Sequence, residues 1–181
     1  LLRDPPDTVP TTASHGPVGP VAAVFAGGEV RTGLFDRAQE SWVAVSSQDG
    51  RYRALSAPDL PEPRTGAVSV SPDGRWLAWG AEGGVVLYDA VRDEATRVET
   101  VVGGEPFVGD FSADGRLLLA YDDALRVISV EDGEVVGTVV GVGEAAARQA
   151  VWTPDGEAVT YVADGALVRH VWADDSTTAV P

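Results

Sequence analysis

Short apolar segments recur along the chain at a nearly constant interval, each after the same kind of turn. The most apolar of them lie at residues 76–79, 117–121 and 158–162. The tetrapeptide before each segment is Ser/Thr-Pro/Ala-Asp-Gly, and its copies begin at Ser71, Ser112 and Thr153, 41 residues apart (112 − 71 and 153 − 112). Proline presets φ for a type I turn, and glycine accepts a left-handed backbone. The pattern therefore predicts three β-hairpins on one repeat period, which is typical of a repeat architecture.

Two further turns fall in each period and divide it into four short strands. The second turn lies at 82–84, 122–123 and 164–165, and the third at 93–94, 132–133 and 174–175. The second strand of each period is apolar on both alternating faces, whereas the outer strand at 96–100 alternates with charged residues. A strand with two apolar faces is buried between two other sheets. We therefore expect an all-β chain: a β-propeller of about four blades, each a four-stranded antiparallel meander, and part of a larger ring.

The repeats also predict how the chain is divided. We expect a proline-rich leader or linker at 1–17, an incomplete or divergent blade at 18–58, and blades at 59–101, 102–141 and 142–181. The first blade has no convincing innermost strand, because the first 20 residues hold five of the twelve prolines. Propellers close by pairing the two ends of the chain, so we expect the missing strand to come from residues beyond Pro181. A closed four-blade ring and a self-completing dimer are the alternatives.

Residues 71–79, Ser-Pro-Asp-Gly-Arg-Trp-Leu-Ala-Trp, resemble the WD-repeat and TolB-like β-propeller families of bacteria. The similarity extends over about residues 66–180 and, more weakly, over 18–56. The chain departs from the eukaryotic WD pattern, because no Gly-His pair opens a blade and the Trp-Asp dipeptide is absent; Tyr88-Asp89 is the nearest match. The resemblance implies a propeller that serves as a binding platform, and it specifies no particular partner.

The charge and composition of the chain restrict its chemistry and its partners. The chain has 13 basic residues, all arginine, and 28 acidic residues, for a formal net charge of −15. A polyanion would be repelled, so we expect no binding of nucleic acid. The absence of cysteine and lysine excludes disulfides, thiolate metal sites and Schiff-base chemistry. No apolar run reaches the roughly 18–20 residues of a transmembrane segment. Because methionine is absent, we expect further residues upstream of Leu1.

The residues that commonly catalyse reactions or bind metals are isolated in this sequence. His170 lies in a predicted strand and His15 in the leader, and neither has further metal ligands at a suitable spacing. The adjacent pairs Asp122-Asp123 and Asp174-Asp175 do not follow the alternating ligands of an EF-hand loop. No Gly-x-Ser-x-Gly elbow is present. We therefore predict no catalytic residues, no metal site and no cofactor, in a chain that is not an enzyme.

The connections between the predicted strands differ in how much they vary. In a blade, the first-to-second and third-to-fourth turns share one side of the disc, and here they are short and alike. The second-to-third turns and the blade-to-blade crossings share the other side and vary in length. Variable segments on a rigid scaffold are where recognition residues usually lie. That variable side contains arginine and aromatic residues of the types enriched in binding hot spots, namely Arg31, Phe35, Arg37, Arg64 and Phe107.

We therefore predict that a protein partner docks on this variable side and contacts the loop that contains Phe35. The function expected is a non-catalytic scaffold that mediates protein–protein interaction. The acidic charge and the proline-rich leader favour the extracytoplasmic part of a bacterial envelope protein, tethered through its N-terminus. A cytoplasmic interaction propeller and the gating propeller of a larger hydrolase are the alternatives. An oligomer, or additional blades outside this chain, is compatible with each of these functions.

Overall fold

The computed structural model describes residues 9–30, 39–63, 66–100 and 104–180, which form four antiparallel sheets. The first sheet contains β1 (Val21–Val30), β2 (Gln39–Ser46) and β3 (Tyr52–Ala54). The second contains β4 (Ser69–Val70), β5 (Trp76–Ala81), β6 (Gly84–Asp89) and β7 (Glu94–Glu99). The third contains β8 (Phe107–Phe111), β9 (Leu117–Tyr121), β10 (Leu125–Ser129) and β11 (Glu134–Val139). The fourth contains β12 (Val151–Trp152), β13 (Ala158–Ala163), β14 (Ala166–Val171) and β15 (Ser176–Val180).

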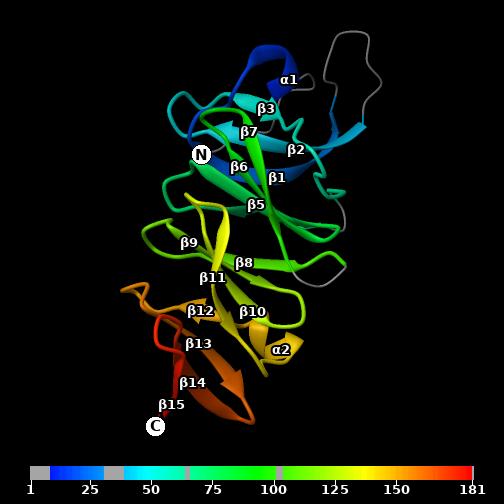
Figure 1. Cartoon of the computed structure of the whole chain (residues 1–181). Helices are drawn as coiled ribbons and strands as arrows, with labels where there is room; N and C mark the ends of the chain where they lie inside the picture. The colour runs from blue at the N-terminus through cyan, green and yellow to red at the C-terminus, as the bar shows by residue number, and fades with distance from the viewer. Residues whose placement is uncertain (1–8, 31–38, 64–65, 101–103, 181) are drawn as a thin grey trace.

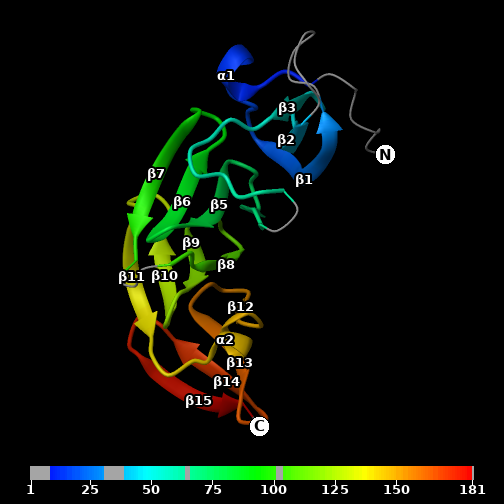
Figure 2. The same cartoon turned by 90° about the vertical axis from the view of Figure 1, so that its right-hand side faces the viewer.

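The four sheets stack one after another along an open arc (Figure 1). In Figure 2 the last strands β7, β11 and β15 follow the convex edge of the arc, while β8 and β12 lie on the concave side. Helix is confined to α1 (Thr12–His15) and α2 (Glu144–Ala147) within the described ranges. The chain is therefore all-β with a β-propeller-like fold, as the repeat predicted. The alternative of a closed four-blade ring is wrong for the described residues, because the first and last sheets lie at opposite ends of the arc (Figure 2).

The repeated tetrapeptide forms the predicted hairpin turn, and its side chains bond to the backbone of that turn. The Ser71 hydroxyl donates to Asp73 Oδ1 at 2.6 Å and accepts the Trp76 N–H at 2.9 Å. Asp73 Oδ1 also accepts the Arg75 N–H at 3.0 Å. Gly74 has φ of +72°, which an L side chain rarely adopts. The turns at Ser112 and Thr153 repeat this arrangement, so the hydroxyl, the aspartate and the glycine of each copy hold the turn.

The second sheet is buried on both faces, which explains why its central strands are apolar on both alternating faces, with Asp89 at the end of β6 as the charged exception. Leu77 and Trp79 of β5 pack against the first sheet. Ala78 of β5 and Leu87 of β6 pack against the third sheet. All four side chains have no exposed surface. The hydrophobic core is therefore a series of layers between neighbouring sheets, in which each sheet is stabilised mainly by the sheets beside it.

The described part of the predicted leader covers the far face of the first sheet. Val9 is fully buried against Val43 and Ala54, on the face opposite the second sheet. The Ala54 N–H donates to the Pro10 carbonyl at 3.0 Å, and Thr11 forms a parallel bridge with Ala54. These residues lie beside β3, at the other edge of the sheet from β1. They therefore do not supply the missing innermost strand, whose origin beyond Pro181 stays a prediction.

The fourth sheet has one well-covered face among the residues that the structure describes. Val159 and Tyr161 face the third sheet and are buried. The opposite face contains Val162, Leu167 and Val180, which lie side by side across β13, β14 and β15. Their exposed fractions are 45%, 45% and 38%. The fourth sheet therefore leaves an apolar row in contact with solvent. The corresponding face of the second sheet is instead buried against the third sheet.

Candidate binding surfaces

Three adjoining hollows form a groove, here called the crossing-face groove, on the side of the arc that contains the blade-to-blade crossings. Their volumes are about 240, 490 and 280 Å³. The first two share residues 60–62, and the last two share Gly66, Gly80 and Glu105. The groove therefore runs from β2 in the first sheet, past the β5–β6 turn, to Arg148 at the end of α2. The second-to-third turn and the crossings meet on one side here, as expected from the sequence.

Acidic side chains dominate the charge of the crossing-face groove. Its described lining contains five carboxylates, Glu40, Asp59, Glu62, Glu82 and Glu105. One of them, Asp59, accepts a hydrogen bond from Arg97 Nη1 at 2.8 Å. Arg148 is the one basic side chain among the described lining residues. The groove therefore favours a ligand that contributes positive charge.

Arg148 and Phe107 stack at one end of the groove. The Arg148 guanidinium carbon lies 4.4 Å from the centre of the Phe107 ring, which places the cation over the π face. Arg148 Nε and Nη2 also donate to Glu144 Oε1 at 3.0 and 2.8 Å. Helix α2 holds this pair in place, because its Ala147 is buried against the fourth sheet. The result is a fixed aromatic and cationic end to a groove that is otherwise acidic.

Of the five site residues that the sequence predicts, the structure places one. Arg31, Phe35, Arg37 and Arg64 lie outside the described residues. Phe107 is the first residue of β8, half-buried in the groove wall. Whether these five residues contact a partner therefore stays a prediction.

The sequence contained a signal for the Arg148–Phe107 contact that the site prediction did not use. The two residues are 41 apart, which is the repeat period (148 − 107). Other contacts between neighbouring sheets have nearly the same separation: Ser69 Oγ–H donates to the Gly109 carbonyl, and Trp152 Nε1–H to the Asp110 carbonyl. Residues one period apart thus lie beside each other in adjacent sheets.

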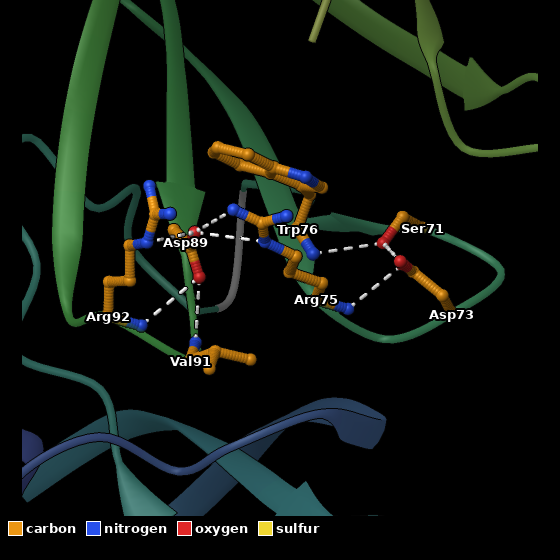
Figure 3. Close-up of polar contacts among 7 residues, drawn as sticks. All are labelled: Ser71, Asp73, Arg75, Trp76, Asp89, Val91 and Arg92. Atoms are coloured by element: carbon orange, nitrogen blue, oxygen red, sulfur yellow. Dashed lines mark hydrogen bonds and ion pairs between the residues drawn. The ribbon is translucent and has the colours of Figure 1, made fainter. Parts of the chain in front are cut away.

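On the opposite side of the arc, a buried carboxylate holds together the ends of two strands of the second sheet (Figure 3). Asp89, at the end of β6, is 1% exposed. Its Oδ2 accepts hydrogen bonds from Arg75 Nε at 3.0 Å and Nη2 at 2.8 Å. Its Oδ1 accepts the N–H groups of Val91 and Arg92 at 2.9 and 3.1 Å. Burial raises the pKa of Asp89, but these hydrogen bonds outweigh it and hold the pKa below its ordinary value.

A second buried carboxylate lies in the β9–β10 turn. The side chain of Asp122 is 5% exposed. Its Oδ1 accepts the N–H groups of Asp123 and Ala124 at 2.6 and 3.1 Å, and Arg126 Nε at 3.2 Å. Burial raises the pKa of Asp122, but the hydrogen bonds from this turn and the charge of Arg126 lower it to about 2. Asp122 therefore serves the turn, which lies where the repeat predicted it, at 122–123, although its side chain is buried.

The lowered pKa of Asp122 predicts a loss of stability in acid. Because the folded-state pKa is about 2 and the ordinary pKa of the group is 3.8, the ionised form stabilises the folded state fully above the unfolded-state pKa. We expect this contribution, up to about 2 kcal/mol, to disappear as the pH falls from about 4 to about 2. Denaturant unfolding of the native chain and of Asp122→Asn should differ at pH 7 and converge near pH 2. A difference that is the same at both pH values would contradict this assignment.

The histidines and the metal-binding residue types form no cluster in the described ranges. No group of three or more His, Cys, Asp or Glu side chains is placed there to hold a metal ion. His170 is 2% exposed, and its Nδ1 lies 2.8 Å from Thr177 Oγ1. Of the helices in this part of the chain, none is long and apolar enough to cross a membrane.

Comparison with known proteins agrees with the class of fold that the four sheets define, a β-propeller-like protein. No protein-family model matches the chain, and no curated protein matches it. Among solved structures, the chain is similar to a chain of Kuenenia stuttgartiensis hydrazine synthase, with a TM-score of 0.52 and 19% sequence identity. The likeness covers 77% of this chain and 43% of that chain. At this identity the likeness shows the fold alone, over less than half the length of the hydrazine synthase chain.

Proposed function

We propose that this chain is a non-catalytic binding module, and that its crossing-face groove holds an extended, basic segment of a protein partner. The observation that supports the proposal is the groove itself, which spans several sheets and is lined by five carboxylates. The three adjoining hollows form a long path rather than one enclosed cavity. A long path accommodates a polypeptide segment better than a small compact ligand.

The apolar groups along the groove supply contact area for such a segment. Trp42 is buried beneath one end of the groove, and its indole N–H donates to the Pro61 carbonyl at 2.7 Å, so it fixes the apolar lining at Leu60 and Pro61. Phe107 is fixed at the other end beneath Arg148. Rigid aromatic side chains lose little conformational entropy on binding, which makes them effective anchors. The partner contacts predicted from the sequence for Arg31, Phe35 and Arg37 are a separate prediction, because arginine does not attract a basic segment.

The chemistry of the groove supports binding rather than catalysis. Among its described lining residues the only hydroxyl is that of Ser41, and no histidine lies beside it. A nucleophile of this type requires an adjacent base within hydrogen-bond reach. The carboxylates would instead act through their charge, which favours encounter with a basic partner and weakens as salt is added.

Selection from a random-peptide display library tests this proposal even though the partner is unidentified. Peptides selected on the native chain should be rich in arginine and lysine. Their affinity should fall about tenfold, or about 1.4 kcal/mol, when three groove carboxylates are neutralised. The groove variant is Glu62→Gln, Glu82→Gln and Glu105→Gln. The matched control neutralises three exposed carboxylates of the outer strands, Glu94→Gln, Glu99→Gln and Glu134→Gln.

The control separates a specific effect of the groove from the effect of total charge. Both variants change the net charge by the same amount, so non-specific attraction falls equally in both. Equal weakening in the two variants would contradict the proposal. Selection of peptides without basic residues would contradict it as well.

A further inference from the structure

A second hollow, here called the turn-face cleft, lies on the opposite side of the arc between the second and third sheets. Its volume is about 290 Å³. Its walls are the two Asp-Gly turns of these sheets and the β6–β7 and β10–β11 turns. Arg75 and Arg116 occupy the same position after the two Asp-Gly turns, one repeat period apart. Arg92 of the β6–β7 turn is the third arginine in the lining.

Two of these three guanidinium groups donate no hydrogen bond to a described residue. The third, Arg75, donates two hydrogen bonds to Asp89, as described above. Arg92 Nε lies 3.9 Å from Asp89 Oδ2, an oxygen that already accepts two hydrogen bonds from Arg75. Arg116 Nε lies 3.8 Å from Asp114 Oδ2. Both distances exceed a hydrogen bond, and neither guanidinium donates one to any described residue.

The three carboxylates in the lining differ in how many of their hydrogen bonds are already made within their own turns. Asp73 and Asp114 each use Oδ1 to accept a serine hydroxyl and a backbone N–H within their own turn. The Ser112 hydroxyl and the Arg116 N–H lower the pKa of Asp114, which keeps it ionised as a turn residue. Glu131, by contrast, accepts no hydrogen bond from a described residue and is exposed at the rim. The cleft therefore has two guanidinium groups that donate no hydrogen bond to a described residue. They are opposed by the charge of Glu131, and by the charges of Asp73 and Asp114, which are bound within their own turns.

Trp76 supplies an aromatic surface in the same cleft. It is half-buried, and the Arg75 guanidinium lies 4.9 Å from its ring centre. Figure 3 shows Arg75 fixed between this ring and Asp89. Tryptophan and arginine are the residue types most enriched in binding hot spots. The combination gives the cleft a rigid, partly apolar wall beside its exposed charged groups.

From these observations we propose that the turn-face cleft is a binding site for a carboxylate side chain of a protein partner, held by Arg92 and Arg116 beside Trp76. A carboxylate is planar and singly charged, so it can accept paired hydrogen bonds from a guanidinium. Phosphate would bring a greater negative charge close to Glu131, Asp73 and Asp114, and it is disfavoured for that reason. The site is independent of the crossing-face groove, because it lies on the other side of the arc.

NMR titration of the 181-residue chain with short capped peptides tests this site. The probe is acetyl-Gly-Glu-Gly-amide, the neutral control is acetyl-Gly-Gln-Gly-amide, and inorganic phosphate is the third ligand. The glutamate peptide should shift the Trp76 indole N–H signal and the amide signals of Arg92 and Arg116. The glutamine peptide should leave these signals unchanged. Phosphate should bind more weakly than the glutamate peptide.

Two variants should change the affinity for the glutamate peptide in opposite directions. Arg92→Gln with Arg116→Gln should weaken binding of the glutamate peptide at least tenfold. Glu131→Gln should strengthen it several-fold, since it removes the one opposing carboxylate of the lining that is not bound within a turn. Both arginine side chains are mostly exposed, at 64% and 84%, and an unchanged amide spectrum elsewhere verifies the fold. Equal shifts with both peptides, unchanged affinity in the arginine variant, or tighter binding of phosphate would each overturn the proposal.

Discussion

Replacing Gly74 with alanine should destabilise the chain more than the same change at an equivalent turn glycine. The φ of Gly74 is +72°, and a Cβ atom there would lie 2.1 Å from the Val21 carbonyl oxygen. The Gly74 carbonyl also accepts the Val21 N–H at 2.7 Å, so this turn holds β1 against the second sheet. The left-handed backbone alone costs about 1–2 kcal/mol. Moving the first sheet away should cost a further 1–3 kcal/mol, roughly the range for an overpacked core.

Gly115 is the matched control for this prediction. It occupies the same turn position in the third sheet with φ of +73°, and the nearest atom to an added Cβ lies at 3.8 Å. Gly115→Ala therefore adds the backbone strain without the collision. Urea unfolding of both variants, followed by tryptophan fluorescence, measures the difference in the free energy of unfolding. Equal losses in the two variants would show that the contact between Gly74 and Val21 does not hold the first sheet.

Replacing Asp89 with alanine should have the second large effect, a loss of about 3 kcal/mol in the free energy of unfolding. The substitution leaves the Val91 N–H without its side-chain acceptor and removes both hydrogen bonds from Arg75. Breaking a buried ion pair by removing one partner typically costs about 3–5 kcal/mol. The lower end applies here, because Arg75 is 39% exposed and its freed guanidinium can be hydrated.

Asp89→Asn separates the two contributions of this carboxylate. Asparagine keeps an oxygen that can accept the Val91 and Arg92 N–H groups, and it loses the charge that Arg75 binds. We expect a loss of about 1–2 kcal/mol, between those of the native chain and the alanine variant. Thermal or urea denaturation at pH 7 measures both variants. Losses below about 0.5 kcal/mol in both, the range of ordinary surface substitutions, would contradict a stabilising role for this network.

The layered fold was predictable because the information that specifies it is local. Each tetrapeptide such as Ser71–Gly74 closes its own turn through side-chain and backbone hydrogen bonds, and these depend on residues at most five apart. The apolar runs that follow, such as 76–79, indicate burial on both faces without reference to any other part of the chain. A fixed period then implies repeated sheets that stack on one another.

The surfaces were less predictable because they depend on how one sheet meets the next. The Arg75–Asp89 ion pair joins the two ends of a hairpin, and the turn motif before Arg75 does not reveal it. Arg116 follows the same motif without such a partner, because Ser129 occupies the position that Asp89 has in the second sheet. The Arg148–Phe107 stack requires a short helix in a crossing that the pattern of apolar residues does not reveal. The packing of Val9 against the first sheet could not be predicted, because the prolines around it interrupt the alternation of apolar and polar residues that indicates a strand.

Because one face of the fourth sheet is uncovered, this sheet should be held less strongly in the folded chain than the first sheet at the other end of the arc. In an array stabilised by nearest neighbours, a sheet with one such interface is held less strongly than a sheet with two. The first sheet has a second packed face, because Val9 packs against Val43 and Ala54 on the side away from the second sheet. The apolar row of Val162, Leu167 and Val180 has no comparable cover among the described residues. Fraying in this chain should therefore begin at β12–β15 and travel toward the second sheet, so that β5 and β6 are the last strands to open.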